Sequence, residues 1–332
     1  MMFLKSMQTA PVLTLAALAV TPAISLAQSS PQTVSIQFAA KVGERPFSCS
    51  ESYLLGTANT QVMPTDFRLY VSEVALIDAD GNAVPLELEQ DGQWQYQNVA
   101  LLDFEDRTGA CANGTVETRN QVVGTVPAGG YQGLRFTLGV PFDLNHEDAT
   151  LAPSPLNLTS LWWNWRGGYK FLRVDLENHT VISDRSSLEA KNGATSHSAD
   201  KPGGEHPGHP SQPDPGHGDG HSVHGDQTAA PGIAIHIGST GCQIEGDRQQ
   251  PTVCSSPNRS DIVLDSFDPS QDVVVVDLAA LVADNNLMET APNTPTGCMS
   301  SPDDGDCVGI MGNLGIPFGE ASAPEQTVFR AE

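Results

Sequence analysis

The sequence predicts an all-β protein, an antiparallel Greek-key-like β-sandwich with long loops and disulfide bonds. Three observations support this: apolar and polar side chains alternate, turn residues separate the alternating segments, and the number of cysteines is even. The alternation is clear at Val34–Phe38, Leu134–Val140 and Ile233–Ile237, as expected for half-buried strands. Further strands are expected at Phe67–Asp78, Val84–Leu88, Val122–Val126, Tyr169–Leu176, Ile262–Phe267 and Val273–Leu278, with one short helix at Leu278–Ala283.

The N-terminus has the pattern of a secretory signal peptide. Lys5 provides a positive charge, an apolar run extends from Pro11 to Ile24, and Ser25–Ala27 offers the small side chains that a signal peptidase requires. The run is shorter than the roughly 20 residues that a membrane span needs. We therefore expect cleavage after Ala27 and a periplasmic or secreted protein. The mature chain, residues 28–332, is expected to form one β domain without a membrane span.

Six cysteines follow the expected cleavage site, and in an oxidising compartment an even number indicates disulfides. Many pairings are possible, but proximity along the chain favours Cys298–Cys307 and Cys242–Cys254, which leaves Cys49–Cys111. The sequence contains no C-x-x-C motif, which argues against a thioredoxin-type or zinc-ribbon site.

The chain is strongly acidic, with 40 Asp and Glu against 16 Lys and Arg and a formal charge of −24. Such a charge repels a phosphate backbone, so nucleic acid and anionic membranes are poor partners. A cation or a basic protein surface is favoured, although acidity could also serve solubility alone.

Residues from about 186 to 231 are rich in Gly, Pro, His, Ser and Asp and contain almost no large apolar side chains. We expect a disordered insertion, because such a segment cannot bury enough apolar surface to offset the entropy of ordering. Its imidazoles could bind copper, zinc or nickel, or it could be a solvated linker with incidental histidines. The histidines that favour metal capture are His206, His209, His217, His221 and His224.

Other candidate ligands lie in the expected domain. Trp163 and Trp165 would share one face of an extended segment, either as part of a packed aromatic core or as functional residues. His236 alternates with apolar strand residues and could be a metal ligand or a hydrogen-bonded core histidine. His146 and His179 lie in loop-like contexts and are expected at the surface.

No enzyme class is supported, because G-x-S-x-G, H-E-x-x-H and P-loop motifs are absent from the sequence. The acidic runs Asp103–Asp106 and Asp303–Asp306 offer oxygen ligands but lack EF-hand spacing. Because these oxygen ligands could bind calcium, an alternative function is a calcium-stabilised secreted interaction module without a redox role.

Several separate segments together resemble the MbnP-like family, the methanobactin-associated periplasmic proteins also called metallo-mystery-pair four-Cys-motif proteins. The resemblance extends over nearly the whole mature chain except the His-rich insertion. The matching segments are Asp66–Ser72, Leu102–Phe104, Trp163–Trp165, Gly168–Phe171, His236–Cys242, Asn258–Arg259, Gly297–Ser300 and Asp306–Cys307.

The resemblance implies a copper-binding protein that is a substrate rather than a catalyst. Members of the family are paired with a di-haem c-type enzyme related to cytochrome c peroxidase and MauG, which oxidises a tryptophan to kynurenine. The resulting aniline nitrogen, beside imidazole, suits copper by ligand type. Trp163 or Trp165 is therefore the expected oxidation target, with His236 as a copper ligand. The chain departs from the family in its insertion and in having Trp162 where another aromatic residue is usual.

Overall fold

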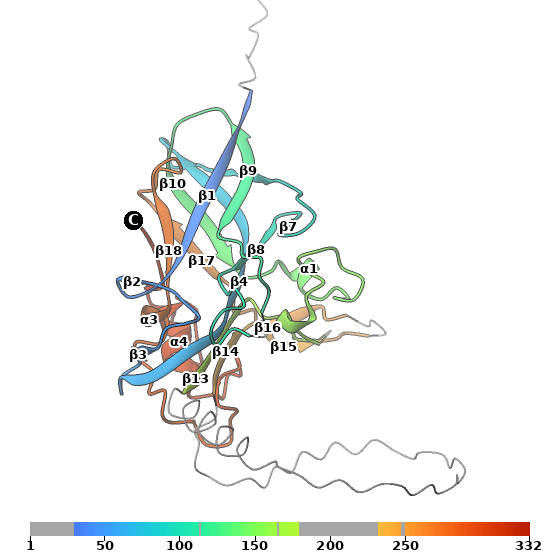
Figure 1. The fold of residues 1–332 in the computed structure, drawn as a ribbon. Helices are drawn as coiled ribbons and strands as arrows, with labels where there is room; N and C mark the ends of the chain where they lie inside the picture. Colours follow the sequence, from blue (N-terminus) through green and yellow to red (C-terminus); the bar gives the residue numbers. More distant parts are fainter. Residues whose placement is uncertain (1–29, 113, 165, 179–231, 247–249) are drawn as a thin grey trace, which may run out of the picture.

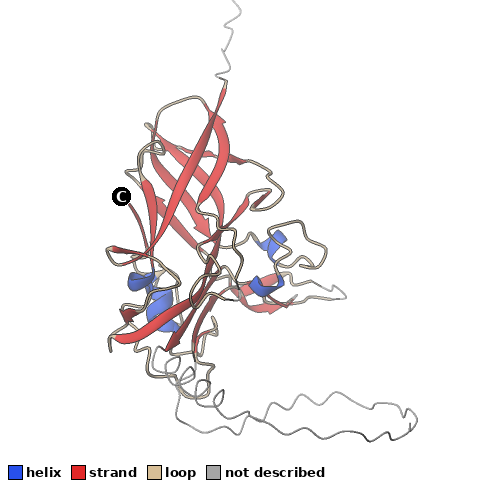
Figure 2. Cartoon of the chain, viewed as in Figure 1, coloured by secondary structure: helices blue, strands red, loops and turns tan. Residues whose placement is uncertain are grey.

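The computed structural model describes residues 30–112, 114–164, 166–178, 232–246 and 250–332. The expected signal peptide, the His-rich insertion with its five candidate ligands, His179 and Trp165 lie outside these ranges. Strands dominate the described part of the chain, and the prediction of an all-β fold is confirmed (Figures 1 and 2).

Two sheets pack face to face as a sandwich. The first has the strand order β20-β18-β1-β9-β6, with β2 paired to β1. Its strands are β1 (Pro31–Val42), β2 (Arg45–Pro46), β6 (Glu87–Leu88), β9 (Gln121–Pro127), β18 (Val273–Asp277) and β20 (Phe329–Ala331).

The second sheet has the order β17-β10-β4-β13-β14-β19, with β3, β5 and β8 also paired to β4 and β7 paired to β8. Its strands are β3 (Tyr53–Leu55), β4 (Thr60–Asp78), β5 (Ala83–Pro85), β7 (Gln95–Tyr96), β8 (Val99–Asp103), β10 (Tyr131–Leu138), β13 (Leu172–Asn178), β14 (Ile233–Ile237), β17 (Ser260–Leu264) and β19 (Gly297–Cys298). Two separate two-stranded sheets join β11 (Trp162–Asn164) to β12 (Gly168–Tyr169) and β15 (Thr240–Gln243) to β16 (Val253–Ser256).

The helices are short: α1 (Phe142–Asn145), the 3₁₀ turn η1 (Thr159–Leu161), α3 (Leu278–Leu281) and α4 (Cys307–Asn313). The expected helix at Leu278 forms because the Asp277 carboxylate accepts the backbone N–H groups of Ala279 and Ala280. Helix α4 has no counterpart in the predicted elements. None of the helices in the described ranges combines the length and apolar composition that a bilayer crossing requires.

Pairing directions differ from the purely antiparallel prediction, which is wrong in two places. Strand β1 pairs with β18 in parallel, and β14 pairs with β19 in parallel. A period of two is common to both pairing directions, so alternation along one strand does not determine the direction of its neighbour. The expected strand at Val84–Leu88 is also divided, because β5 pairs with β4 of one sheet and β6 with β9 of the other.

Aromatic side chains fill the space between the sheets. Phe38 from the first sheet meets Phe136 from the second edge-on, with ring centroids 5.6 Å apart, and Phe136 meets Phe329 at 5.4 Å. All three side chains are almost completely buried. Each such burial contributes about 1.5–3 kcal/mol to folding.

Three disulfides fix the loops, with the pairing that proximity favours: Cys49–Cys111, Cys242–Cys254 and Cys298–Cys307. No cysteine is free. The first closes a loop of 62 residues, and the chain-entropy model gives it roughly 4 kcal/mol of stabilisation.

Charged groups are buried beside the core where β4 meets β8. Arg68 on β4 forms a bidentate pair with Asp66, and both residues are about 5% exposed. Asp103, at the end of β8 and opposite Arg68 in the ladder, is 2% exposed. Burial raises the pKa of Asp103 to about 8; Arg68 opposes this shift and Glu105 adds to it.

The buried carboxyl group predicts a specific pH dependence of stability. The folded-state pKa of Asp103 exceeds the unfolded value of about 3.9, so the folded chain binds more protons between the two values. Its contribution to stability is complete below pH 4 and is lost as the pH rises to about 8. Asp103→Asn keeps an acceptor for the Glu105 N–H and should be stabilised relative to the wild type at pH 8, but not at pH 4. Urea unfolding at both values measures this, with exposed Asp303→Asn as the control.

Candidate functional site

The aromatic segment forms a tight hairpin, β11–β12. Asn164 Oδ1 accepts the backbone N–H groups of Arg166 and Gly167, each at 2.9 Å, and Gly168 has a positive φ of 75°. Trp162 packs against a second apolar cluster that includes Tyr70, Tyr169 and Phe171. Its indole Nε1 is buried and makes no hydrogen bond to a described residue.

Trp163 packs instead against the chain just beyond β14. A methyl group added at Gly238 would lie 2.7 Å from Cζ3 of Trp163 and 2.5 Å from the carbonyl oxygen of Tyr169. One added at Gly167 would lie 3.2 Å from Cε3 of Trp163. Two glycines therefore make room for the indole. Gly238 directly follows β14, one residue beyond the buried Ile237 and two beyond His236.

The backbone around Gly238 is held by side chains from two distant loops. Its N–H donates to Ser300 Oγ at 3.0 Å, and the same hydroxyl donates to the carbonyl oxygen of His236 at 3.0 Å. Asn258 Nδ2 donates to the carbonyl oxygen of Gly238 at 2.8 Å. Asn258 and Ser300 therefore fix the backbone against which Trp163 lies.

His236 belongs to an ionic network on the outer face of the second sheet. Its Nε2 lies 2.7 Å from Asp175 Oδ1 on the neighbouring strand β13. Asp175 also binds Arg173, whose Nε lies 3.1 Å from Asp66 Oδ2. Burial opposes ionisation of Asp175, but the His236 hydrogen bond and charge, with Arg173, lower the pKa of this carboxyl. The imidazole is thus oriented by an ionised carboxylate, with His236 only 8% exposed.

A pocket of about 410 Å³ lies over this network. Its lining is strongly charged: Asp66, Arg68, Arg173, Asp175 and Glu177 contribute, together with Ser160 and the start of β14. Its volume and polarity suit a small polar ligand.

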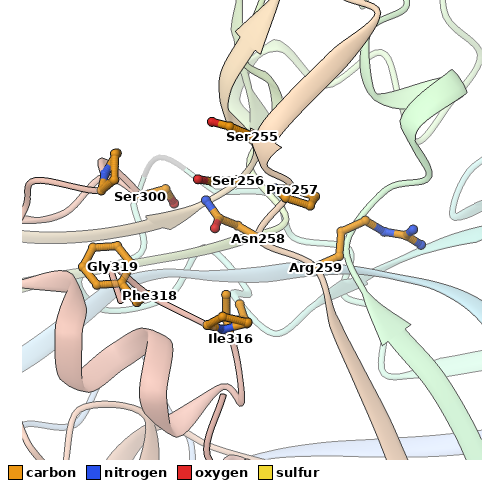
Figure 3. Close-up of a pocket in the computed structure, with 11 residues that line it drawn as sticks. Ser255, Ser256, Pro257, Asn258, Arg259, Ser300, Ile316, Phe318 and Gly319 are labelled. Atoms are coloured by element: carbon orange, nitrogen blue, oxygen red, sulfur yellow. The ribbon is translucent and has the colours of Figure 1, made fainter. Parts of the chain in front are cut away.

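A second pocket, of about 420 Å³, lies beyond the hairpin β15–β16 (Figure 3). It is lined by Ser255–Arg259, Ser300, Pro302 and Ile316–Gly319. In Figure 3 the Arg259 side chain extends away from Phe318, and it binds Ser72 and Glu73 on β4. Arg259 therefore joins two parts of the second sheet.

His146 is a candidate ligand that sequence reasoning missed. It was expected at the surface, but it follows helix α1 and is only 3% exposed, so that expectation is wrong. Its Nε2 lies 3.4 Å from Cys254 Sγ. Among the described residues, His146, Cys242 and Cys254 form the one group of three potential ligands whose atoms all lie within 4.8 Å. The acidic runs at 103–106 and 303–306 do not form such a group there. The tertiary fold brings His146 next to the hairpin β15–β16, and the local sequence around residue 146 does not indicate this contact.

The structure thus places two of the sequence-predicted site residues, Trp163 and His236, beside one short segment. That segment, His236–Cys242, continues into the disulfide beside His146. Trp165 and the five insertion histidines remain predictions, because they lie outside the described residues.

Comparisons with known proteins support an MbnP-like family and fold. The family model described as MbnP matches residues 31–213. The structure of MbnP from Methylosinus trichosporium superposes with a TM-score of 0.69 at 26% sequence identity, covering 91% of this chain and 98% of that one. A search of curated proteins finds no match.

The close contact at Gly238 predicts a local defect when a side chain is introduced. Gly238→Ala should displace Trp163, because the new methyl group would lie within 3 Å of both the indole and a backbone oxygen. We expect altered near-ultraviolet circular dichroism and a loss of about 1–3 kcal/mol in unfolding free energy. Gly312→Ala, where the nearest non-local atom would lie at 3.7 Å, is the matched control. An unchanged aromatic spectrum in Gly238→Ala would contradict the contact.

Proposed function

The chain belongs to the MbnP family, and from that premise we propose that it is an exported periplasmic copper-binding protein matured by oxidation of a tryptophan to kynurenine. The modifying enzyme would be a di-haem c-type partner. The observation that supports this most directly is the position of Trp163, whose indole lies against Gly238, two residues beyond His236. The chain's own role is that of substrate and metal carrier rather than catalyst.

His236 has the surroundings of a metal-binding histidine. Ligating histidines usually bond their second ring nitrogen to a carboxylate, which fixes the ring orientation and strengthens the ligand. In His236 the carboxylate of Asp175 holds Nε2, and Nδ1 is the nitrogen that would bind copper. Arg173 and Asp66 hold Asp175 in place, so the ion pairs of this sheet position the ligand.

Trp163 is the preferred oxidation target on the described part of the chain. With peroxide as the oxidant, the partner would add two oxygen atoms across the double bond of the pyrrole ring and break it. Water would then release the formyl carbon as formate, which leaves an aniline nitrogen and a ketone oxygen. Trp163 lies against Gly238, two residues beyond His236, whereas Trp162 packs into the apolar cluster around Tyr70. A nitrogen generated at Trp163 would therefore be added beside the segment that begins at His236. Trp165 remains the second candidate, since the motif 163–165 is the family signature.

The charge of the chain supports docking with an enzyme of complementary charge. A net charge of −24 favours a basic partner surface and makes association faster at low ionic strength. The histidines of the insertion would add weaker and less selective copper capture.

Co-expression with the di-haem partner tests the proposal. Peptide mass spectrometry of the wild type should find one tryptophan that has lost a carbon atom and gained an oxygen atom. Trp163→Phe should abolish this product and the tightest copper site. Asp175→Asn should leave the modification intact but weaken copper binding about 10- to 100-fold, because it removes the carboxylate that orients His236 while Arg173 keeps its ion pair with Asp66.

Trp94→Phe is the matched control, since Trp94 lies elsewhere, in the turn before β7. The assignment is wrong if Trp163→Phe still acquires the product at Trp162 or Trp94. The proposal itself fails if the wild type is never modified and all copper binding disappears with the insertion histidines.

A further inference from the structure

One disulfide has a histidine beside its sulfur atoms. Cys242 on β15 and Cys254 on β16 face each other across the hairpin, and Nε2 of His146 lies 3.4 Å from Cys254 Sγ. The two sulfur atoms and a ring nitrogen all lie within 4.8 Å of one another. Figure 1 shows α1, which precedes His146, next to β15 and β16. Three soft or intermediate ligand atoms are thus already gathered at one point.

The imidazole is held in a specific orientation. Asn145 Oδ1 accepts the backbone N–H of Tyr169 at 2.8 Å, so its Nδ2 is the group that lies 3.4 Å from Nε2 of His146. Because an amide N–H is a donor, this contact is a hydrogen bond in the tautomer whose Nε2 carries the lone pair. Gln250 donates to the carbonyl oxygen of His146 at 3.0 Å, and the Phe142 ring packs edge-on against the imidazole at 4.8 Å. Nε2 is thus the ring nitrogen that lies beside both the Asn145 amide and the sulfur of Cys254.

This disulfide is also the most accessible of the three. Cys242 is 9% exposed and Cys254 is partly exposed, whereas the other four cysteines are at most 2% exposed. Among the residues that the structure describes, the hairpin β15–β16 is a separate two-stranded sheet that pairs with neither large sheet. Thiol–disulfide exchange requires access for the attacking thiolate, so a reductant should open this bond first.

We propose that Cys242–Cys254 is a reducible metal site, in which the two thiols and Nε2 of His146 bind one thiophilic ion, foremost Cu(I). A dithiol reductant would transfer two electrons and two protons, becoming a disulfide while the Cys242–Cys254 bond breaks into two thiols. Metal binding then releases the two thiol protons. Thiolate sulfur selects Cu(I) and zinc, and imidazole suits both. The site needs neither tryptophan oxidation nor the di-haem partner, so it is independent of the proposed copper site.

Copper X-ray absorption on the full chain, produced without the partner enzyme, tests the proposal. The chain is treated with dithiothreitol under argon, freed of reductant, given one equivalent of Cu(I) and compared with the untreated chain. The reduced chain should have two titratable thiols and show sulfur in the copper coordination shell, and the untreated chain should not. The insertion at 186–231 contains no cysteine, so a sulfur signal from cysteine cannot come from it.

Two variants make the test specific. Cys242→Ser/Cys254→Ser should lose cysteine ligation, and His146→Gln should keep both thiols but bind Cu(I) at least about tenfold more weakly against a chromogenic chelator. The proposal is overturned if mass mapping finds that another disulfide opens first, or if the reduced chain shows no cysteine sulfur on copper. It is also overturned if His146→Gln binds Cu(I) as tightly as the wild type. Failure of tryptophan oxidation would leave all these outcomes unchanged.

Discussion

The pairing of strand β4 with its neighbours is the constraint on which both the sandwich and the candidate site depend. β4 pairs with β10 and β13 along most of its length, and β3, β5 and β8 pair with it as well. The buried face of β4 supplies core residues such as Phe67 and Leu69. Asp66 and Arg68 of the same strand form an ion pair that lines the charged pocket of about 410 Å³. Removing one member of a buried pair costs about 3–5 kcal/mol, because the remaining charge is left uncompensated. Asp66 of this pair also binds Arg173, and Arg173 binds Asp175. Asp175 in turn orients the His236 ring. Stability and ligand geometry therefore rely on one row of charges.

A second constraint is the close approach of side chain to backbone at Gly238. An indole can lie there only because the residue lacks a side chain and because Ser300 and Asn258 bond its N–H and carbonyl groups. Ser300 and Asn258 both have positive φ values, of 62° and 50°. Such backbone strain persists only where surrounding structure enforces it, and it is common at functional sites. The loops after β16 and β19 thus serve to fix one short stretch of main chain.

Much of the sandwich could be predicted from the alternation of apolar and polar residues, because every second side chain of a half-buried strand is apolar and points into the core. Ile36 and Phe38, for example, are buried as the pattern at Val34–Phe38 requires. Pairing direction could not be predicted, since β18 and β1 are separated by most of the chain and their parallel contact leaves no local signature. Trp163 and His236 were identifiable through the family signature, whereas His146 was not. The burial of His146 depends on the disulfide hairpin β15–β16, about a hundred residues later in the chain. No local sequence pattern around His146 or Cys254 indicates that the two residues meet.

The two ligand sets proposed for this chain lie on opposite sides of the segment Gly238–Gly241 and need opposite redox conditions. On one side, oxidation of Trp163 would supply a nitrogen near His236; on the other, reduction of Cys242–Cys254 would supply thiolates near His146. Nitrogen and oxygen ligands accommodate both copper oxidation states, while thiolates favour Cu(I). The residues between them form a single short segment. Ser300 and Asn258 bond its backbone at Gly238, and Ser239 within it donates to the carbonyl oxygen of Pro257. The main chain between the two sets is therefore fixed by distant loops, and either set can form without the other.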